Sequence, residues 1–138
     1  MAGGVVRSSA RPTRQGAAAS FTGTVWQDEV VVGTAPSRLR ATVVSFTPGA
    51  RTGWHSHPVG QTLYCLSGIG RICFAGEGPQ VLRPGDTVNI PPDTMHWHGA
   101  APDRLFSHLA MSEQGAEGQG TAWGEHVSDA EYQAPASG

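Results

Sequence analysis

Short apolar runs separated by glycine and proline dominate the chain from Phe21 onward, without a hydrophobic stripe of 3.6-residue period. The runs are rich in Val, Thr, Leu and Ile, which favour strands. The expected strands cover residues 21–27, 38–47, 61–67, 70–76, 79–84, 86–91, 95–101 and 104–112. Turn sequences such as Pro48-Gly49 and Pro84-Gly85-Asp86 separate them. Strands at this short, even spacing predict an all-β sandwich or small barrel with room for one small ligand.

The two ends of the chain differ from this strand-rich middle. Residues 1–20 mix Gly, Ala, Ser and Arg without a hydrophobic period and predict a flexible arm. The Gly-, Glu- and Gln-rich residues 113–120 predict a flexible connection, after which Ser128 or Asp129 is suited to cap a short C-terminal helix. We therefore expect one folded domain over 21–132 and a disordered tail over 133–138.

Composition excludes several partners and chemistries. The 138 residues suit one domain, and the formal net charge of −2 provides no positive field for nucleic acid. All the basic residues are arginine, so a Schiff-base lysine is excluded. No run reaches the roughly 18 apolar residues of a membrane span, and the N-terminal residues lack an apolar signal core, so we expect a cytoplasmic protein without membrane contact. Cys65 and Cys73 show no CxxC spacing and are interpreted as reduced packing residues.

Five of the six histidines lie in the strand-rich middle, at positions 55, 57, 96, 98 and 108. On a strand, His55 and His57 would share a face and lie close enough to bind one ion. Gln61 has the same parity and follows a turn, so its amide oxygen can reach the same ion, and we expect His96 to arrive from the facing sheet. Three imidazoles and one amide oxygen suit one divalent first-row metal. For each histidine alone, a solvent-facing or hydrogen-bonded role is the alternative.

These residues resemble the two conserved motifs of the small cupins, conical β-barrels of the double-stranded β-helix or jelly-roll type with a metal at the base. The first motif is Gly49-(x5)-His55-x-His57-(x3)-Gln61-(x6)-Gly68, and the second is Gly85-(x5)-Pro91-x-Asp93-(x2)-His96. Three positions depart from the family pattern, because Gln61 replaces the usual Glu, Asp93 the usual Gly and Ala100 the usual Asn. The amide at position 61 leaves the ion its full double charge, which should raise its Lewis acidity.

From Phe21 to Tyr132 the chain resembles one cupin subgroup, through FTGTV, PGARTGWHSHPVGQTLY, PGDTVNIPPDTMHWHGAAP, SHLAM and AWGEHVSDAEY. That subgroup contains bacterial manganese-dependent hydroxynitrile lyases and carboxymuconolactone-decarboxylase-like cupins. The resemblance implies a metal site of His55, His57, Gln61 and His96, with Mn as the metal and Fe, Zn, Ni or Co as other candidates. It also implies a proton-transferring histidine at position 108 and a homodimer or higher homo-oligomer.

His108 and His98 are the remaining candidates for chemistry in the predicted pocket. An imidazole that titrates near neutrality is suited to be a general base, and the resemblance favours this role for His108 over a hydrogen-bonded core position. His98 shares its parity with His96. We expect it to line the pocket, where it could also support a metal ligand or complete a four-histidine site.

Three functions remain open for this predicted site. The first is a metal-dependent lyase acting on cyanohydrin-like substrates, the second a metal-dependent dioxygenase or polyketide cyclase, and the third a non-catalytic small-molecule-binding cupin. Thr42 and Val44 share a strand face and are expected to form a pocket wall, although a plain core would show the same pattern. Arg40, Arg51 and Arg71 could each bind a carboxylate substrate, with a solvated strand-face arginine as the commoner alternative.

Overall fold

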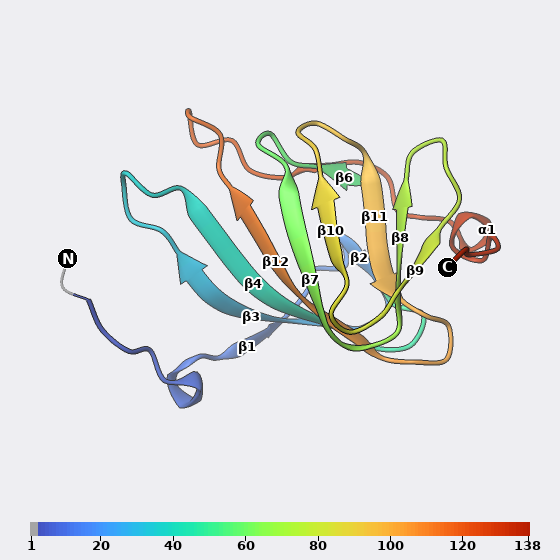
Figure 1. The fold of residues 1–138 in the computed structure, drawn as a ribbon, viewed down its shortest axis with the longest axis horizontal. Coiled ribbons are helices and arrows are strands. Elements are labelled where there is room, and N and C mark those ends of the chain that lie inside the picture. Colours follow the sequence, from blue (N-terminus) through green and yellow to red (C-terminus); the bar gives the residue numbers. More distant parts are fainter. Residues whose placement is uncertain (1–2) are drawn as a thin grey trace.

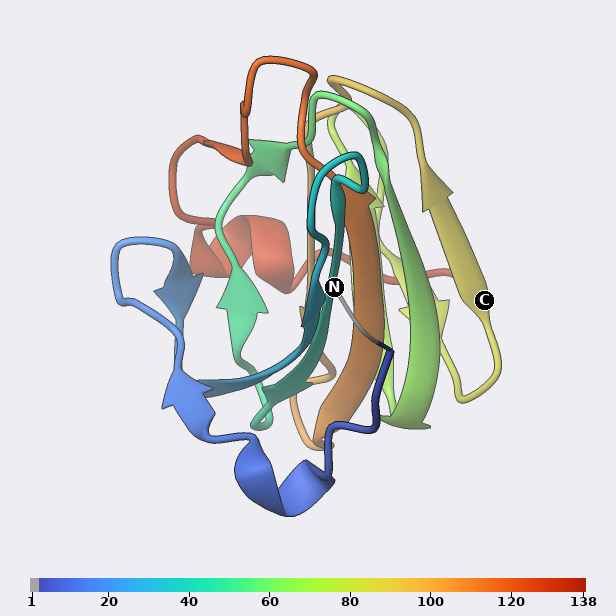
Figure 2. The same ribbon diagram turned by 90° about the vertical axis from the view of Figure 1, so that its left-hand side faces the viewer.

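Residues at every second position of the strands point inward and close two β-sheets around one interior. The computed structural model describes residues 3–138 (Figure 1). The six-stranded sheet has the order β1 (Thr13–Gln15), β3 (Val25–Val32), β4 (Leu39–Phe46), β12 (Phe106–Glu113), β7 (Gln61–Gly68) and β10 (Thr87–Ile90). The seven-stranded sheet has the order β13 (Ala122–Trp123), β6 (His55–Ser56), β11 (His96–Ala100), β5 (Arg51–Thr52) and β2 (Phe21–Thr22), and β8 (Gly70–Phe74) joins β11 to β9 (Gln80–Leu82). Figure 2 shows these sheets as two layers, so the predicted all-β fold is confirmed.

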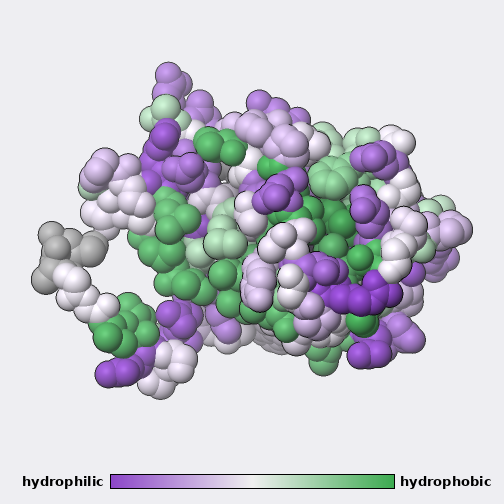
Figure 3. Space-filling model, viewed as in Figure 1, coloured by the Kyte–Doolittle hydropathy of each residue, from purple (hydrophilic) through white to green (hydrophobic). Residues whose placement is uncertain are grey.

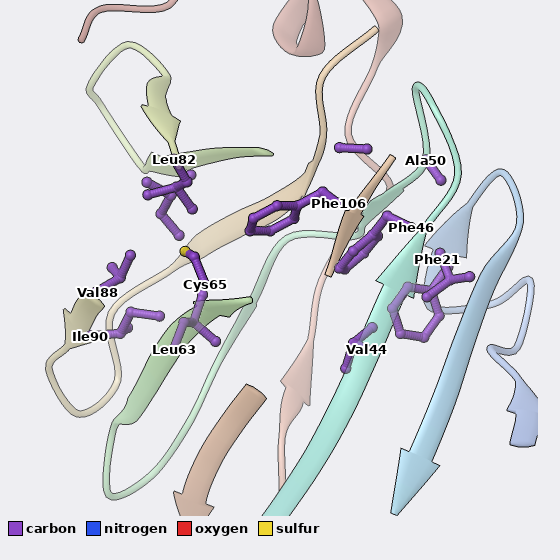
Figure 4. Close-up of a cluster of buried hydrophobic side chains, with 13 residues drawn as sticks. Phe21, Val44, Phe46, Ala50, Leu63, Cys65, Leu82, Val88, Ile90 and Phe106 are labelled. Atoms are coloured by element: carbon purple, nitrogen blue, oxygen red, sulfur yellow. The ribbon is translucent and has the colours of Figure 1, made fainter. Parts of the chain in front are cut away.

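The apolar core lies inside the barrel where β4 ends and β12 begins. The rings of Phe46 and Phe106 stack there with their centroids 6.2 Å apart. From this pair the core continues to Leu63 and Cys65 on β7 and to Val88 on β10, as Figure 4 shows. Burial of these side chains supplies most of the free energy that holds the two sheets together.

The predicted strand over residues 21–27 is divided between the two sheets. Gly23 has a positive φ of 79°, which turns the chain between β2 and β3. A side chain there would also place a Cβ 2.9 Å from the Cβ of Ala50, so glycine is required at this corner. The strand pattern predicted neither the extension of β3 to Val32 nor the two-residue strands β5 and β13.

The N-terminal arm differs from its prediction at Thr13–Gln15. These residues form β1 and pair antiparallel with β3, with Thr13 opposite Asp28. A short 3-10 helix, Ser8–Ala10, precedes them, and residues 1–2 lie outside the described residues. The pairing consists of backbone hydrogen bonds at a sheet edge and one side-chain bond, in which the hydroxyl of Thr13 donates to the carboxylate of Asp28. The exposed sequence Thr-Arg-Gln carries no hydrophobic signal for it.

The C-terminal tail also differs from its prediction, because it lies along β9 instead of being disordered. The backbone N–H of Val81 donates to the carbonyl oxygen of Ser137 at 2.8 Å, and the N–H of Ser137 donates to that of Pro79 at 3.0 Å. The predicted short helix is confirmed as α1 (Asp129–Tyr132), with Ser128 and Glu131 forming a capping box. The sequence did not predict this pairing, because an open strand edge can form hydrogen bonds with any backbone, whatever its side chains.

Several large apolar side chains are exposed on the six-stranded sheet. They are Trp26, Val30 and Val32 on β3, Leu39 on β4, and Tyr64 and Leu66 on β7. Figure 3 shows hydrophobic residues gathered over the strands β3 and β4. Association of the chain into dimers stays a prediction. Within residues 3–138, none of the helices has the length and apolarity needed to cross a lipid bilayer.

Candidate active site

Two of the predicted metal ligands lie opposite each other on neighbouring strands. His55 on β6 and His96 on β11 are antiparallel Cα partners, and their ring centroids are 4.2 Å apart. The expectation that His96 arrives from the facing sheet is therefore wrong. Cross-strand neighbours in one sheet bring side chains together as closely as two facing sheets can, and sequence spacing does not distinguish the two arrangements.

The turn after β6 carries His57 to the same place and leads to Gln61. His57 is buried, and its ring centroid is 5.1 Å from that of His55. Gly60, at φ 87°, packs so closely that an added Cβ would lie 2.6 Å from the carbonyl oxygen of Ile90. The chain then enters β7 at Gln61, so the facing sheet contributes the amide and not the third imidazole.

Asp93 explains how this chain departs from the family glycine without losing the turn. Its φ is 56°, a left-handed conformation that Asp adopts more readily than most residues. Its backbone N–H donates to the carbonyl oxygen of His57 at 2.8 Å. The loop that leads into β11 is thereby tied to the turn that follows β6, which places His57 relative to His96.

Backbone carbonyls orient two of the imidazoles. The Nδ1 atoms of His55 and His96 lie 2.8 Å from the carbonyl oxygens of Gly53 and Thr94. Because a carbonyl only accepts, we assign the ring hydrogen to Nδ1, which leaves the lone pair on Nε2. This is the arrangement by which proteins present a histidine to a metal.

The donor atoms of this group fit a divalent metal. Nε2 of His57, Oε1 of Gln61 and Nε2 of His96 are buried, and none has a hydrogen-bond partner within residues 3–138. Unpaired buried polar atoms are costly, so their convergence calls for a ligand. The residues present thus fit the metal that the cupin resemblance implies.

His98 is a further candidate in the same cluster. One nitrogen from each of His55, His96 and His98 lies within 4.8 Å of the others. By ring centroid, His57 is 5.6 Å and His98 5.7 Å from His96, so distance alone admits either as a ligand. The three-histidine cluster suggests a metal site, and the set of His55, His57, Gln61 and His96 stays a prediction.

Burial keeps these imidazoles uncharged. Burial, and secondarily repulsion from the His96 ring, lower the pKa of His57 to about 4, against a smaller opposing effect of the Gln61 amide. Burial is also the main cause that lowers the pKa values of His55, His96 and His98. Neutral rings keep their lone pairs at neutral pH, which metal binding requires.

His98 and His108 form a hydrogen-bonded pair beside the cluster. Nε2 of His108 lies 2.9 Å from Nδ1 of His98, and both side chains are buried. Among the described residues, Nδ1 of His108 and Nε2 of His98 have no other partner. Burial lowers the pKa of His108 to about 3. The expected titration near neutrality is therefore wrong for His108, because burial disfavours the charged ring. The pair is uncharged at neutral pH and offers one nitrogen with a lone pair and one with a hydrogen to the interior of the barrel.

A cavity of about 240 Å³ opens beside this pair. The predicted pocket residues Thr42, Val44 and His98 all line it, as do His55, His57, Gln61 and His108. Further lining residues that the sequence pattern did not indicate are Phe21, Gln27, Thr52, Ala110, Ser112, Thr121 and Trp123. Trp123 lies opposite His55 in the strand pair β13–β6, which no sequence spacing predicts.

The three candidate arginines lie in different environments. Arg51 is buried outside the cavity, where its guanidinium donates to Asp129 and to the carbonyl oxygen of Val127, both at 2.8 Å. Arg71 donates to the carbonyl oxygen of Tyr132 at 2.9 Å. Neither lines the cavity, whereas Arg40 does.

Comparisons with known proteins identify the family of this chain. The family profile described as "Cupin domain" matches residues 42–107. The chain is 40% identical to an (R)-mandelonitrile lyase of Granulicella tundricola over 128 residues, which are 93% of this chain and 97% of that protein. The chain belongs to the cupin family.

Solved cupin structures share the fold. A cupin-like protein of Thermotoga maritima has a TM-score of 0.82 and 39% identity, covering 86% of this chain and 90% of its own. A polyketide cyclase of Streptomyces resistomycificus has a TM-score of 0.73 at 16% identity, covering 96% and 92% of the two chains, and shows the fold alone. The cupin barrel predicted from the two motifs is confirmed, and the lyase relative supports an enzyme.

Proposed function

We propose that this protein is a metal-dependent hydroxynitrile lyase, which cleaves an α-hydroxynitrile into an aldehyde and hydrogen cyanide. The observation that carries the proposal is the His98–His108 pair, which lies in the cavity beside a convergent set of unpaired metal-donor atoms. The 40% identity to an (R)-mandelonitrile lyase supports it, because that relative covers nearly the whole chain.

The metal would be held by His55, His57, Gln61 and His96. Their neutral imidazole and amide donors accept first-row divalent ions, of which manganese is the one that the subgroup resemblance implies. When bound, such an ion supplies positive charge that stabilises the charge developing on oxygen or cyanide as the C–C bond opens. The amide of Gln61, in place of a carboxylate, leaves that charge undiminished.

His108 would take the hydroxyl proton of the substrate. If Nε2–H of His108 donates to Nδ1 of His98, the lone pair of His108 is on Nδ1, which has no partner in residues 3–138. As the proton moves to Nδ1, the O–H electrons form the C=O bond of the aldehyde, and the C–C electron pair leaves with cyanide. The proton then returns from Nδ1 to cyanide, which gives hydrogen cyanide.

The same tautomer gives His98 a separate role. Its Nδ1 accepts from His108, so its Nε2 carries a hydrogen and can donate to the substrate oxygen or to cyanide. A protonated Nε2 cannot bind a metal, which favours His57 over His98 as a ligand. The low pKa of His108 makes its charged form a strong acid, which suits the return of the proton to cyanide.

The cavity walls suit a small aromatic aldehyde. Val44 and Ala110 provide an apolar wall, and the rings of Phe21 and Trp123 meet edge to face with centroids 5.8 Å apart. Aromatic rings of this arrangement accept a further ring by stacking or edge contact. Mandelonitrile is therefore the first substrate to test.

The decisive experiment is cyanide release from mandelonitrile by the metal-loaded protein and by His108→Ala. Loss of a general base predicts a decrease of roughly 10²- to 10⁴-fold in turnover, with the metal content per chain unchanged. His126→Ala is the matched control, because His126 lies outside the cavity and contacts the carbonyl oxygen of Ala18 at 2.7 Å. Full turnover in His108→Ala would contradict the role of His108, and oxygen uptake without cyanide release would favour the oxygenase alternative.

A further inference from the structure

Arg40 lies at the mouth of the cavity, on the strand that forms its wall. Val44, Thr42 and Arg40 of β4 line the cavity and pair with His108, Ala110 and Ser112 of β12. Along this face Val44 is buried, Thr42 is half-buried and Arg40 is exposed. Side chains two residues apart on a strand share a face, so the guanidinium follows the pocket wall outward from the histidine pair. Arg40 thus belongs to the same surface as the proposed catalytic histidine.

The guanidinium of Arg40 has no partner within residues 3–138. Its side chain makes no hydrogen bond to a residue of the described range, and the Arg51–Asp129 contact is the one ion pair within that range. The cavity lining contains the neutral histidines and amides described above, but no Asp or Glu among the described residues. Arg40 is therefore the one residue with a fixed charge that lines the cavity in this part of the chain.

We infer that Arg40 binds a carboxylate at the far end of the substrate. That the bound compound is a hydroxynitrile rests on the proposed function, whereas the binding of a carboxylate by Arg40 does not. A planar guanidinium binds a carboxylate through two parallel hydrogen bonds. The other two candidate arginines are already bonded to protein oxygens, so Arg40 alone among the three is free for a ligand in the cavity.

The position of Arg40 defines the shape of this substrate class. Arg40 lies four residues along β4 from Val44, which is opposite His108. At a rise of about 3.3 Å per residue this is about 13 Å of strand, part of which the arginine side chain spans. A compound with a hydroxynitrile at one end and a carboxylate across an aromatic ring, such as 4-carboxymandelonitrile, has that extended form.

Binding tests this inference without turnover. The probes are 4-formylbenzoate and its uncharged analogue 4-formylbenzamide, titrated calorimetrically into the wild-type protein, Arg40→Gln and Arg104→Gln. We expect the wild type to bind the carboxylate roughly tenfold more tightly than the amide, and Arg40→Gln to lose that preference. Arg104→Gln removes the same charge from an exposed loop residue and should keep the preference.

Turnover of the two corresponding hydroxynitriles separates this inference from the proposed function. Preferred binding of the carboxylate that depends on Arg40, without cyanide release, would support the inference and contradict the lyase. Cyanide release with equal binding of the two probes would contradict the inference and support the lyase. Equal loss in Arg40→Gln and Arg104→Gln would overturn the inference, because it would show attraction by net charge alone.

Discussion

The antiparallel strands β4 and β12 line the barrel interior with apolar side chains at one end and polar side chains at the other. Where β4 ends and β12 begins, Phe46 and Phe106 face inward and are 1% and 0% exposed. Where β4 begins and β12 ends, the paired residues Arg40 and Ser112 line the cavity, and Arg40 is exposed. His108 lies on β12 between these two ends. It is as buried as the two phenylalanines, but its side chain is polar.

The difference shows how a barrel supports buried polar groups. Apolar side chains close one end and supply the free energy of folding, so the other end can hold unpaired nitrogens at a cost of about 1–3 kcal/mol each. Figure 4 shows Phe46 and Phe106 next to each other within the cluster of buried apolar side chains. Substitutions at the two ends should therefore separate stability from activity.

The largest effect is expected from His96→Ala at the histidine end. His96 is one of the proposed metal ligands, so its loss should remove the metal from the protein and reduce turnover by roughly 10⁴-fold, since a bound metal would supply several kcal/mol of charge stabilisation. The measurements are elemental analysis and cyanide release, with near-UV circular dichroism to show that the apolar end remains folded. His126→Ala should retain both the metal and the rate of turnover. If His96→Ala also retained both, the proposed metal site would be contradicted.

Phe106→Ala should lower the free energy of unfolding by about 3–5 kcal/mol, because it removes a fully buried ring and leaves a cavity. The ring also fills the space beside Gly70, where an added Cβ would lie 2.6 Å from it. The measurement is the free energy of unfolding in urea, without metal. Leu105→Ala, at a neighbouring residue that is 58% exposed, should cost less than about 1 kcal/mol. Equal losses of unfolding free energy in the two variants would show that the apolar end is not the main core.

The smallest expected effect concerns Cys65, a buried thiol on the inward face of β7. Burial, assisted by the charge of Asp86, raises its pKa from 9.0 to about 11. The unfolded chain therefore loses this proton first as the pH rises, so the stability that the neutral thiol contributes is complete below pH 9 and lost between pH 9 and 11. The loss is at most about 1.4 kcal/mol per pH unit.

Urea unfolding at pH 8 and pH 10 measures this contribution. The wild type should lose more stability between the two pH values than Cys65→Ala, which lacks the thiol. Cys73, whose pKa burial also raises, remains in both proteins and so cancels in the comparison. The same loss in the two proteins would place the alkaline sensitivity elsewhere in the chain.

Alternation and spacing predicted most of the strands and the cavity wall. Thr42 and Val44 could be placed there because the two-residue period of a strand is local and independent of its partners. Trp123 and β1 could not, because a two- or three-residue strand is held by its neighbours and has no pattern of its own. The pairing of His98 with His108 was likewise hidden, since the two residues come from different sheets.

The sequence by itself determined the barrel and the chemical character of its interior, because the period of apolar residues and the number of histidines are properties of the chain alone. Only the tertiary structure decided which strands are neighbours, and so which imidazoles meet. It placed His55 beside His96 in one sheet, brought Gln61 from the other, and left Arg40 at the mouth of the cavity without a partner among residues 3–138. Contacts between distant segments depend on strand order and register, which short sequences with interchangeable side-chain patterns leave open.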